Sequence, residues 1–133
     1  MAQHNKTALV TGASRGIGRA TAAALARAGA HVLVHYGRSE REAVSVVSEI
    51  ETKGGLANAI SADLGTPNGA ALLAKQVRSI VGDRLDVLVS NAGISKAATI
   101  KDHTVEDFDN LFATNVRSPF FLVQQLLPVL GED

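Results

Sequence analysis

Short apolar runs alternate with longer amphipathic segments through the first ninety residues, and this alternation constrains the fold more than any other feature. Continuous apolar runs of this length, bounded by turn residues, are typical of strands that are covered on both faces. They occupy residues 7–11, 31–35, 56–61 and 86–90. Segments with helical spacing lie between them, at residues 18–29, 40–55 and 67–83. This order predicts an α/β fold with a doubly wound parallel sheet and right-handed crossovers.

The intervening segments carry signals of helix ends and of buried faces. Helix ends are indicated by three glycines at Gly29, Gly54 and Gly82, and Pro67 suits the first turn of the third helix. In the second helix the buried stripe is predicted at Val44, Val47 and Ile50. In the third helix it is predicted at Leu72 or Leu73, Val77, and Ile80 or Val81.

A last long helix is predicted from Thr104 to residue 127, after an irregular loop that follows Ser90. The sequence TVED at its start fits a capping pattern. Within it, Pro119 has no N–H to donate to the carbonyl of Asn115, and its ring disturbs that turn. The proline therefore predicts either a simple kink or a carbonyl left open for another partner.

The sequence TGASRGIG, residues 11–18, places three glycines where the first strand meets the first helix. Gly12 allows a sharp turn, Gly16 lets the backbone approach a pyrophosphate, and Gly18 lets the helix pack closely on the sheet. The helix N-terminus adds free N–H donors and a partial positive charge. The stretch predicts a nucleotide-phosphate site, against the alternative of a plain tight turn before an alanine-rich helix.

Composition excludes several other classes of function. Thirteen basic residues balance thirteen acidic ones, so no global field attracts nucleic acid. Without cysteine, disulfides and thiolate metal sites are excluded. On a strand His31 and His35 would lie about 13 Å apart, and His4 and His103 fall in predicted loops, so no metal site is expected. No apolar run has the length of a membrane span or leader, and a cytoplasmic protein is expected.

Four motifs in order resemble those of the short-chain dehydrogenases/reductases, across essentially the whole chain. They are TGASRGIG, the sequence ADL at residues 62–64, SNAG at 90–93, and ATNVRSPFF at 113–121. The stretch VLVHYGRSEREA is most similar to members like the 3-ketoacyl-ACP reductases. The resemblance implies a Rossmann-type sheet with strand order 3-2-1-4. It also implies that residues 1–133 are one nucleotide-binding domain, incomplete at its C-terminus.

The resemblance also implies which residues bind a dinucleotide. Asp63 would contact the adenine amino group with its side chain, and Leu64 the ring with its backbone, although Asp63 could instead cap its own loop. Asn91, Ala92 and Gly93 would lie beside the nicotinamide ribose. Contacts from the glycine turn and the helix start are assigned to Gly12, Ser14, Arg15, Gly16, Ile17 and Gly18.

The end of the second strand indicates NADP rather than NAD. Relatives that bind NAD place an acidic residue there, whereas this chain has Tyr36, followed by Arg38 and Ser39. Arg15 and Arg38 could pair with a 2′-phosphate through charge-assisted hydrogen bonds. The alternative is two solvated arginines.

Catalysis in the family needs a serine, and a tyrosine and lysine spaced Tyr-x-x-x-Lys. The one tyrosine here, Tyr36, has Glu40 at the position of that lysine, and only the family's catalytic-site asparagine is present, as Asn115. We therefore expect an NADP-dependent oxidoreductase lineage, transferring hydride to or from a carbonyl or alcohol substrate, whose residues 1–133 alone have little turnover. The alternative is a nucleotide-binding or assembly module without catalysis of its own.

Self-association is expected from the predicted sheet order. The fourth strand would lie at an open edge, where unpaired backbone groups favour pairing with another chain. The last helix would lose cover over Phe120, Phe121, Leu126 and Leu127. We expect a homo-oligomer formed through this edge, this helix, or both.

Overall fold

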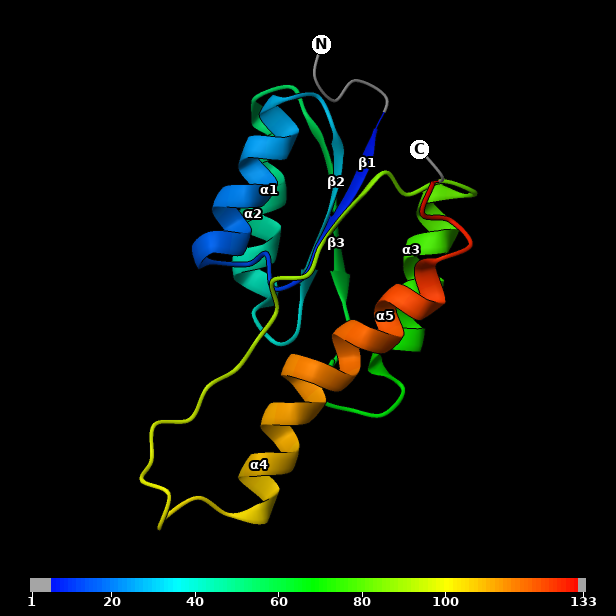
Figure 1. The fold of residues 1–133 in the computed structure, drawn as a ribbon. Helices are drawn as coiled ribbons and strands as arrows, with labels where there is room; N and C mark the ends of the chain where they lie inside the picture. The colour runs from blue at the N-terminus through cyan, green and yellow to red at the C-terminus, as the bar shows by residue number, and fades with distance from the viewer. Residues whose placement is uncertain (1–5, 132–133) are drawn as a thin grey trace.

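The computed structural model describes residues 6–131, which form a parallel β-sheet with helices on both faces (Figure 1). The strands are β1 (Thr7–Val10), β2 (His31–Tyr36), β3 (Leu56–Ser61) and β4 (Val87–Val89). The helices are α1 (Gly16–Arg27), α2 (Glu40–Thr52), α3 (Gly69–Val81), α4 (Val105–Phe112), a π-helical turn (Ala113–Arg117) and α5 (Ser118–Leu126). The sheet order is β3-β2-β1-β4, which confirms the Rossmann-type prediction.

Both faces of the sheet are buried, which explains why its strands are apolar at successive positions. Leu9 and Leu33 belong to the core beneath α3 and α5. Val10, Val32 and Val34 belong to the core beneath α1 and α2. Figure 1 shows these two helix layers on opposite sides of the strands, with α4 and the loop before it extending beyond the sheet.

The buried face of α2 is shifted by one residue from the predicted stripe. Its buried residues are Ala43, Val46 and Ile50, whereas Val44 is 49% exposed and Val47 only partly buried. Neighbouring positions on a helix differ by about 100°, and the small Ala43 was not weighted as a core residue. In α3 the open alternatives resolve to Leu73, Val77 and Val81.

The helix ends follow the predicted glycines but not the predicted proline. Gly29, Gly54 and Gly82 all have positive φ and stand just after their helices, as C-terminal glycines do. Pro67, however, precedes the N-cap residue Asn68, so it is outside the first turn of α3.

The predicted last helix is continuous in path but changes its hydrogen-bond spacing midway. The π turn of Ala113–Arg117 joins α4 to α5, and Pro119 lies in the first turn of α5. Since Pro119 has no N–H, it can donate neither to the carbonyl of residue 115, as an α-helix requires, nor to the carbonyl of residue 114, as a π-helix requires. A simple kink was one of the two alternatives predicted at Pro119. The structure instead has a π turn just before the proline.

The open edge of β4 is the one predicted. Leu130 forms an isolated parallel bridge with Leu85, just before β4, and the Leu85 N–H donates to the Val129 carbonyl at 2.7 Å. Phe120 in α5 and Leu127 just after it are 65% and 60% exposed, as expected, but Leu126 is fully buried. The expectation for Leu126 was wrong, because it faces the core that α5 shares with α3.

Candidate functional site

The residues singled out by the sequence gather at the carboxyl edge of the sheet, where the turns after all four strands lie. This is the edge at which doubly wound sheets bind ligands. Gly12 and Gly16 both have positive φ, at 62° and 61°. A Cβ on Gly12 would lie 2.8 Å from the Cα of Ala92, whereas one on Gly16 would meet open space. The first glycine is thus required by packing as well as by backbone geometry, and the second faces solvent.

Gly18 leaves no room for a side chain. A Cβ there would overlap the carbonyl oxygen of Gly12 and lie 2.5 Å from Nδ2 of Asn91. This close approach brings the first turn of α1 against the end of β1. It matches the packing role expected for the third glycine.

The N-terminus of α1 has no partner from its own side chains. Arg15 at the N-cap has extended backbone and makes no side-chain cap, and the first turn contains no acidic residue. Arg15, Gly16 and Ile17 are exposed. Backbone N–H groups and a partial positive charge are therefore available to an anion.

Asn91 joins the loop after β4 to the glycine turn. Its Nδ2 donates to the carbonyls of Thr11 and Gly12, at 3.1 and 3.0 Å. In return, Oγ1 of Thr11 accepts from the N–H groups of Asn91 and Ala92, both at 2.9 Å. Thr11 was missed by the sequence reasoning, although a buried polar residue ending an apolar strand was a usable signal.

His35 joins the same turn to the loop after β3. Its Nδ1 accepts from the Gly12 N–H at 3.0 Å, and its Nε2 lies 2.9 Å from the Ala62 carbonyl. The ring is buried, and this burial lowers the pKa of His35 below its ordinary value of 6.5. The sequence singled out His35 only as half of a metal spacing, and its place in this site was missed.

The loop after β3 is ordered by its own aspartate. Oδ1 of Asp63 accepts from the Gly65 N–H at 2.8 Å, which is the loop-capping alternative considered for this residue. The backbone of the same loop is held from the other side, since Arg117 donates to the Gly65 carbonyl at 3.2 Å. Ser118 Oγ donates to the Leu64 carbonyl. The π turn and α5 thus support the loop proposed to meet adenine.

Asn115 faces the loop after β4. Its Nδ2 donates to the Ile94 carbonyl and its Oδ1 accepts from the Ile94 N–H, each at 2.8 Å. A Cβ on Gly93 would lie 3.2 Å from that same Oδ1. The structure therefore brings Asn115 and the sequence 91–93 together, with the asparagine side chain occupied by the loop and its main chain within the π turn.

Tyr36 ends β2 and packs against the core beneath α1 and α2. Arg38 is exposed, and Ser39 is the N-cap residue of α2 without a side-chain cap. Within residues 6–131, neither Arg15 nor Arg38 donates a side-chain hydrogen bond or forms an ion pair. Both guanidiniums are thus available to an added ligand.

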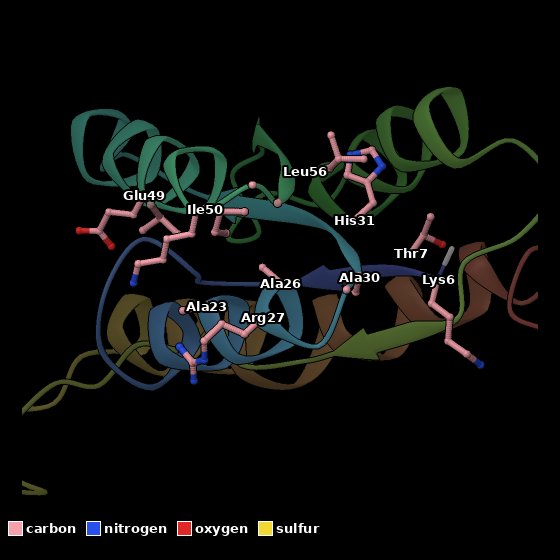
Figure 2. Close-up of a pocket in the computed structure, with 15 residues that line it drawn as sticks. Lys6, Thr7, Ala23, Ala26, Arg27, Ala30, His31, Glu49, Ile50 and Leu56 are labelled. Carbon is pink, nitrogen blue, oxygen red and sulfur yellow. The ribbon is translucent and has the colours of Figure 1, made fainter. Parts of the chain in front are cut away.

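A cavity of about 900 Å³ lies at the opposite, amino end of the strands. Its lining residues, drawn in Figure 2, include the apolar Ala26, Ala30 and Ile50 and the basic Lys6 and Arg27. It includes none of the predicted cofactor residues. The site at the carboxyl edge is therefore defined by its turns and helix terminus and does not coincide with this cavity.

Residues 6–131 contain neither a cluster of metal-ligating side chains nor a helix suited to a membrane. No group of three or more His, Cys, Asp or Glu residues is placed there to hold a metal ion. His31 contacts Oδ1 of Asn58 at 2.5 Å, far from the partners of His35, and His4 lies outside the described residues. In residues 6–131 no helix combines the length and apolar character that a bilayer crossing requires.

Comparison with known proteins gives a match over nearly the whole chain. The family model described as short chain dehydrogenase matches residues 6–133. Versicolorin reductase 1 of Aspergillus parasiticus is 46% identical over 121 residues, covering 90% of this chain and 45% of that protein. Hydroxynaphthalene reductase arp2 of Aspergillus fumigatus is 43% identical over 120 residues, covering 90% and 43%. The chain spans about half the length of the curated relatives it matches.

Solved structures match equally well. A short chain dehydrogenase from Burkholderia cenocepacia J2315 in complex with NADP has a TM-score of 0.94 and 41% identity, over 99% of this chain and 54% of that one. The angucycline C-6 ketoreductase LanV with bound NADP has a TM-score of 0.91 and 42% identity, over 98% and 52%. A 3-oxoacyl-(acyl-carrier-protein) reductase from Agrobacterium tumefaciens C58 with NADP has a TM-score of 0.88 and 35% identity, over 96% and 48%.

Proposed function

Because this chain belongs to the short-chain dehydrogenase family, we propose that the complete protein is an NADP-dependent oxidoreductase acting on a carbonyl or alcohol substrate. The observation that carries this proposal is the uncapped N-terminus of α1, which begins at Gly16, a residue of positive φ whose missing side chain faces open space. Such a helix N-terminus admits a pyrophosphate close to the backbone. The NADP-bound structural neighbours support the same cofactor.

In this proposal each segment of the carboxyl edge has one task. Gly12, Ser14, Gly16, Ile17 and Gly18 hold the pyrophosphate against the α1 N-terminus. Leu64 with Asp63 binds adenine, and the second carboxylate oxygen of Asp63 remains for that contact while Oδ1 caps the loop. The sequence from Asn91 to Gly93 lies beside the nicotinamide ribose, kept in place by Thr11.

NADP over NAD is proposed from the residues around the end of β2. Arg15 and Arg38 are exposed cations that would pair with a 2′-phosphate, with Ser39 and Tyr36 beside them. NADPH should bind more tightly than NADH, and the preference should fall as salt rises. In the complete protein Arg38→Ala should lose the preference, whereas replacing Arg41, an exposed arginine in the first turn of α2, by alanine should keep it. Equal affinity for both cofactors in the unmodified protein would contradict the assignment.

The bound cofactor would supply the hydride. In this chain, the proposed catalytic-site residue is Asn115, whose main-chain carbonyl stands in a turn that Pro119 deprives of one N–H donor. That carbonyl would hold a water linked to the family's lysine, which residues 1–133 do not provide at the Tyr-x-x-x-Lys spacing. We therefore propose that residues 1–133 form the nucleotide-binding part of a longer domain and do not turn over alone.

Activity distinguishes this proposal from a non-catalytic module. The complete protein should oxidise NADPH with ketone or β-ketoacyl substrates, and residues 1–133 alone should not. Oxidation by the short chain at a rate like that of the complete protein would show that the general acid is misplaced. Cofactor binding without oxidation by the complete protein would favour the module, for which the exposed apolar side chains of α4 and α5 are the supporting observation.

Self-association is proposed through the exposed apolar side chains of α4 and α5, through the open edge of β4, or through both. Apolar side chains that are 40% or more exposed on α4, the π turn and α5 include Phe108, Phe112, Val116, Phe120, Phe121 and Val123. Burying a few hundred Å² of such surface is worth several kcal/mol at about 25 cal/mol per Å², before association costs. Light scattering at micromolar concentration should give a molecular mass of at least two chains. A monodisperse monomer that unfolds cooperatively would contradict this.

A further inference from the structure

We propose that His35 is a positioning residue of the dinucleotide site, fixing the glycine turn relative to the loop after β3. This inference rests on the proposed cofactor function, because it concerns the two segments assigned to pyrophosphate and to adenine. His35 itself would touch neither. It would set the spacing between their binding groups.

The geometry links one residue to three main-chain groups. Nδ1 of His35 accepts from the Gly12 N–H at 3.0 Å, and the His35 carbonyl accepts from the Ala13 N–H at 2.9 Å. Nε2 lies 2.9 Å from the carbonyl of Ala62, the residue before Asp63. His35, near the end of β2, thus accepts from two successive N–H groups of the glycine turn. Its side chain also contacts the first residue after β3, Ala62.

The partners determine the state of the ring. A carbonyl can only accept, so Nε2 carries the proton, and an N–H can only donate, so Nδ1 is unprotonated. The ring is 3% exposed, and burial holds the pKa of His35 below its ordinary value. The charged groups of the neighbouring segments, Asp63 and Arg117, both bond to Gly65. The imidazole of His35 is therefore neutral, with Nδ1 accepting from the Gly12 N–H and Nε2 donating to the Ala62 carbonyl.

No other side-chain link between the two segments is present in residues 6–131. Asn91 and Thr11 hold the turn to the loop after β4, and Arg117 with Ser118 holds the β3 loop to the helices. Without His35, each segment would keep its own support but lose its bond to the other. The consequence would fall on a ligand that spans both segments, and far less on a ligand that contacts one.

The decisive variants remove one or both of the side-chain bonds of His35. Asn at position 35 keeps an oxygen near the place of Nδ1 for the Gly12 N–H but is too short to reach Ala62. Phe keeps a ring of similar shape and loses both bonds. His31→Asn is the matched control, because His31 lies on the same strand and bonds the side chain of Asn58 away from the site.

The test measures binding of NADPH and of adenosine 2′-monophosphate, which keeps the adenine but has neither phosphate of the pyrophosphate, to the complete protein. In His35→Phe, NADPH affinity should fall about tenfold or more, the loss expected for removing buried hydrogen bonds, while the affinity for the monophosphate changes less than about threefold. His35→Asn should recover part of the NADPH affinity. His31→Asn should match the unmodified protein with both ligands.

The outcomes separate this inference from the proposed function. Equal losses for both ligands in His35→Phe, or unchanged NADPH affinity in a folded variant, would overturn the positioning role. If His35→Phe does not fold, His35→Asn decides: NADPH affinity reduced more than the affinity for adenosine 2′-monophosphate supports the role, and equal changes overturn it. If the unmodified protein binds neither NADPH nor the monophosphate, the proposed function itself fails and the inference with it.

Discussion

The N-termini of α1 and α4 are built in opposite ways. At α4, Oγ1 of Thr104 accepts from the Asp107 N–H at 3.0 Å, and Asp107 accepts from the Thr104 N–H at 3.2 Å, so the helix satisfies its own donors. Glu106 adds negative charge to the same turn. At α1 there is neither cap nor acid. The α4 terminus contributes stability to the fold, whereas the α1 terminus leaves its N–H donors and its partial charge uncapped by side chains, as the proposed pyrophosphate site requires.

The largest expected effect comes from filling the space at α1. Gly18→Ala would drive a methyl group into the Gly12 carbonyl and Asn91, so we expect about 3 kcal/mol loss of unfolding free energy and loss of NADPH binding. Gly16→Ala is the control, because its Cβ meets open space and only the positive φ, about 1 kcal/mol, opposes it. Denaturant unfolding and cofactor titration measure both. Similar stability losses in the two variants would contradict the close packing at Gly18.

Adding a carboxylate to α1 should raise stability and weaken binding together. Ile17 is 79% exposed in the first turn, so Ile17→Asp disturbs no packing. The helix dipole should stabilise the fold by about 0.3–1 kcal/mol, while repulsion of the phosphates should weaken NADPH binding about tenfold. Ile17→Asn controls for shape. At α4, Glu106→Gln should lower the melting temperature slightly and leave binding unchanged. If Ile17→Asp leaves the NADPH affinity unchanged, the phosphates do not bind at the N-terminus of α1.

Removing the cap of α4 should act on stability alone. Thr104→Ala deletes the oxygen that receives the Asp107 N–H, at a cost of about 1 kcal/mol. The expected result is a lower melting temperature by circular dichroism with unchanged NADPH affinity. Thr104→Ser, which keeps the oxygen, should restore the melting temperature. A change in affinity for Thr104→Ala would show that α4 and the dinucleotide site are coupled.

The smallest expected effect is a difference in acid sensitivity between the two regions. The pKa of His35 is lowered by burial, and the pKa of Asp107 is lowered by its hydrogen bond with the Thr104 backbone and by Lys96. In both cases the unfolded state takes up the proton first, so stability falls as pH falls. The loss begins below 6.5 for His35 and below 3.8 for Asp107. Between about pH 6.5 and pH 4 the unfolding free energy should therefore fall less in His35→Phe than in the unmodified protein, whereas Asp107→Asn should change the pH dependence only below about pH 4. An equal fall in His35→Phe and the unmodified protein would contradict the comparison.

The sheet and its order were predictable because local signals agreed with one another. The apolar runs predicted strands within one residue of those observed, and Gly29, Gly54 and Gly82 marked the helix ends. The face of α2 was missed because the larger Val44 and Val47 were preferred to Ala43, and alanine at a close helix–sheet contact carries little hydrophobic signal. Leu126 was missed because its burial depends on α3, which is distant in sequence.

The candidate site was predictable only where one short segment carries it. The glycine turn fixes its own backbone, so its placement followed from residues 11–18. The bonds of His35 to Gly12 and Ala62 join three segments, and no spacing within one segment reports them. The same holds for Asn115, whose side chain bonds Ile94 from 21 residues away.

The bonds between Thr11 and Asn91 also bear on the order in which the molecule assembles. They span 80 residues, whereas the bond between Gly12 and His35 spans 23, and loop closure at the longer separation costs about 1 kcal/mol more in chain entropy. We expect β1, β2 and β3 to associate before β4 arrives, which leaves the edge of β1 transiently unpaired. Asn91→Ala should then speed unfolding and leave the folding rate nearly unchanged in stopped-flow experiments. A ligand held by the Asn91 loop would consequently bind only after the slowest step of folding is complete.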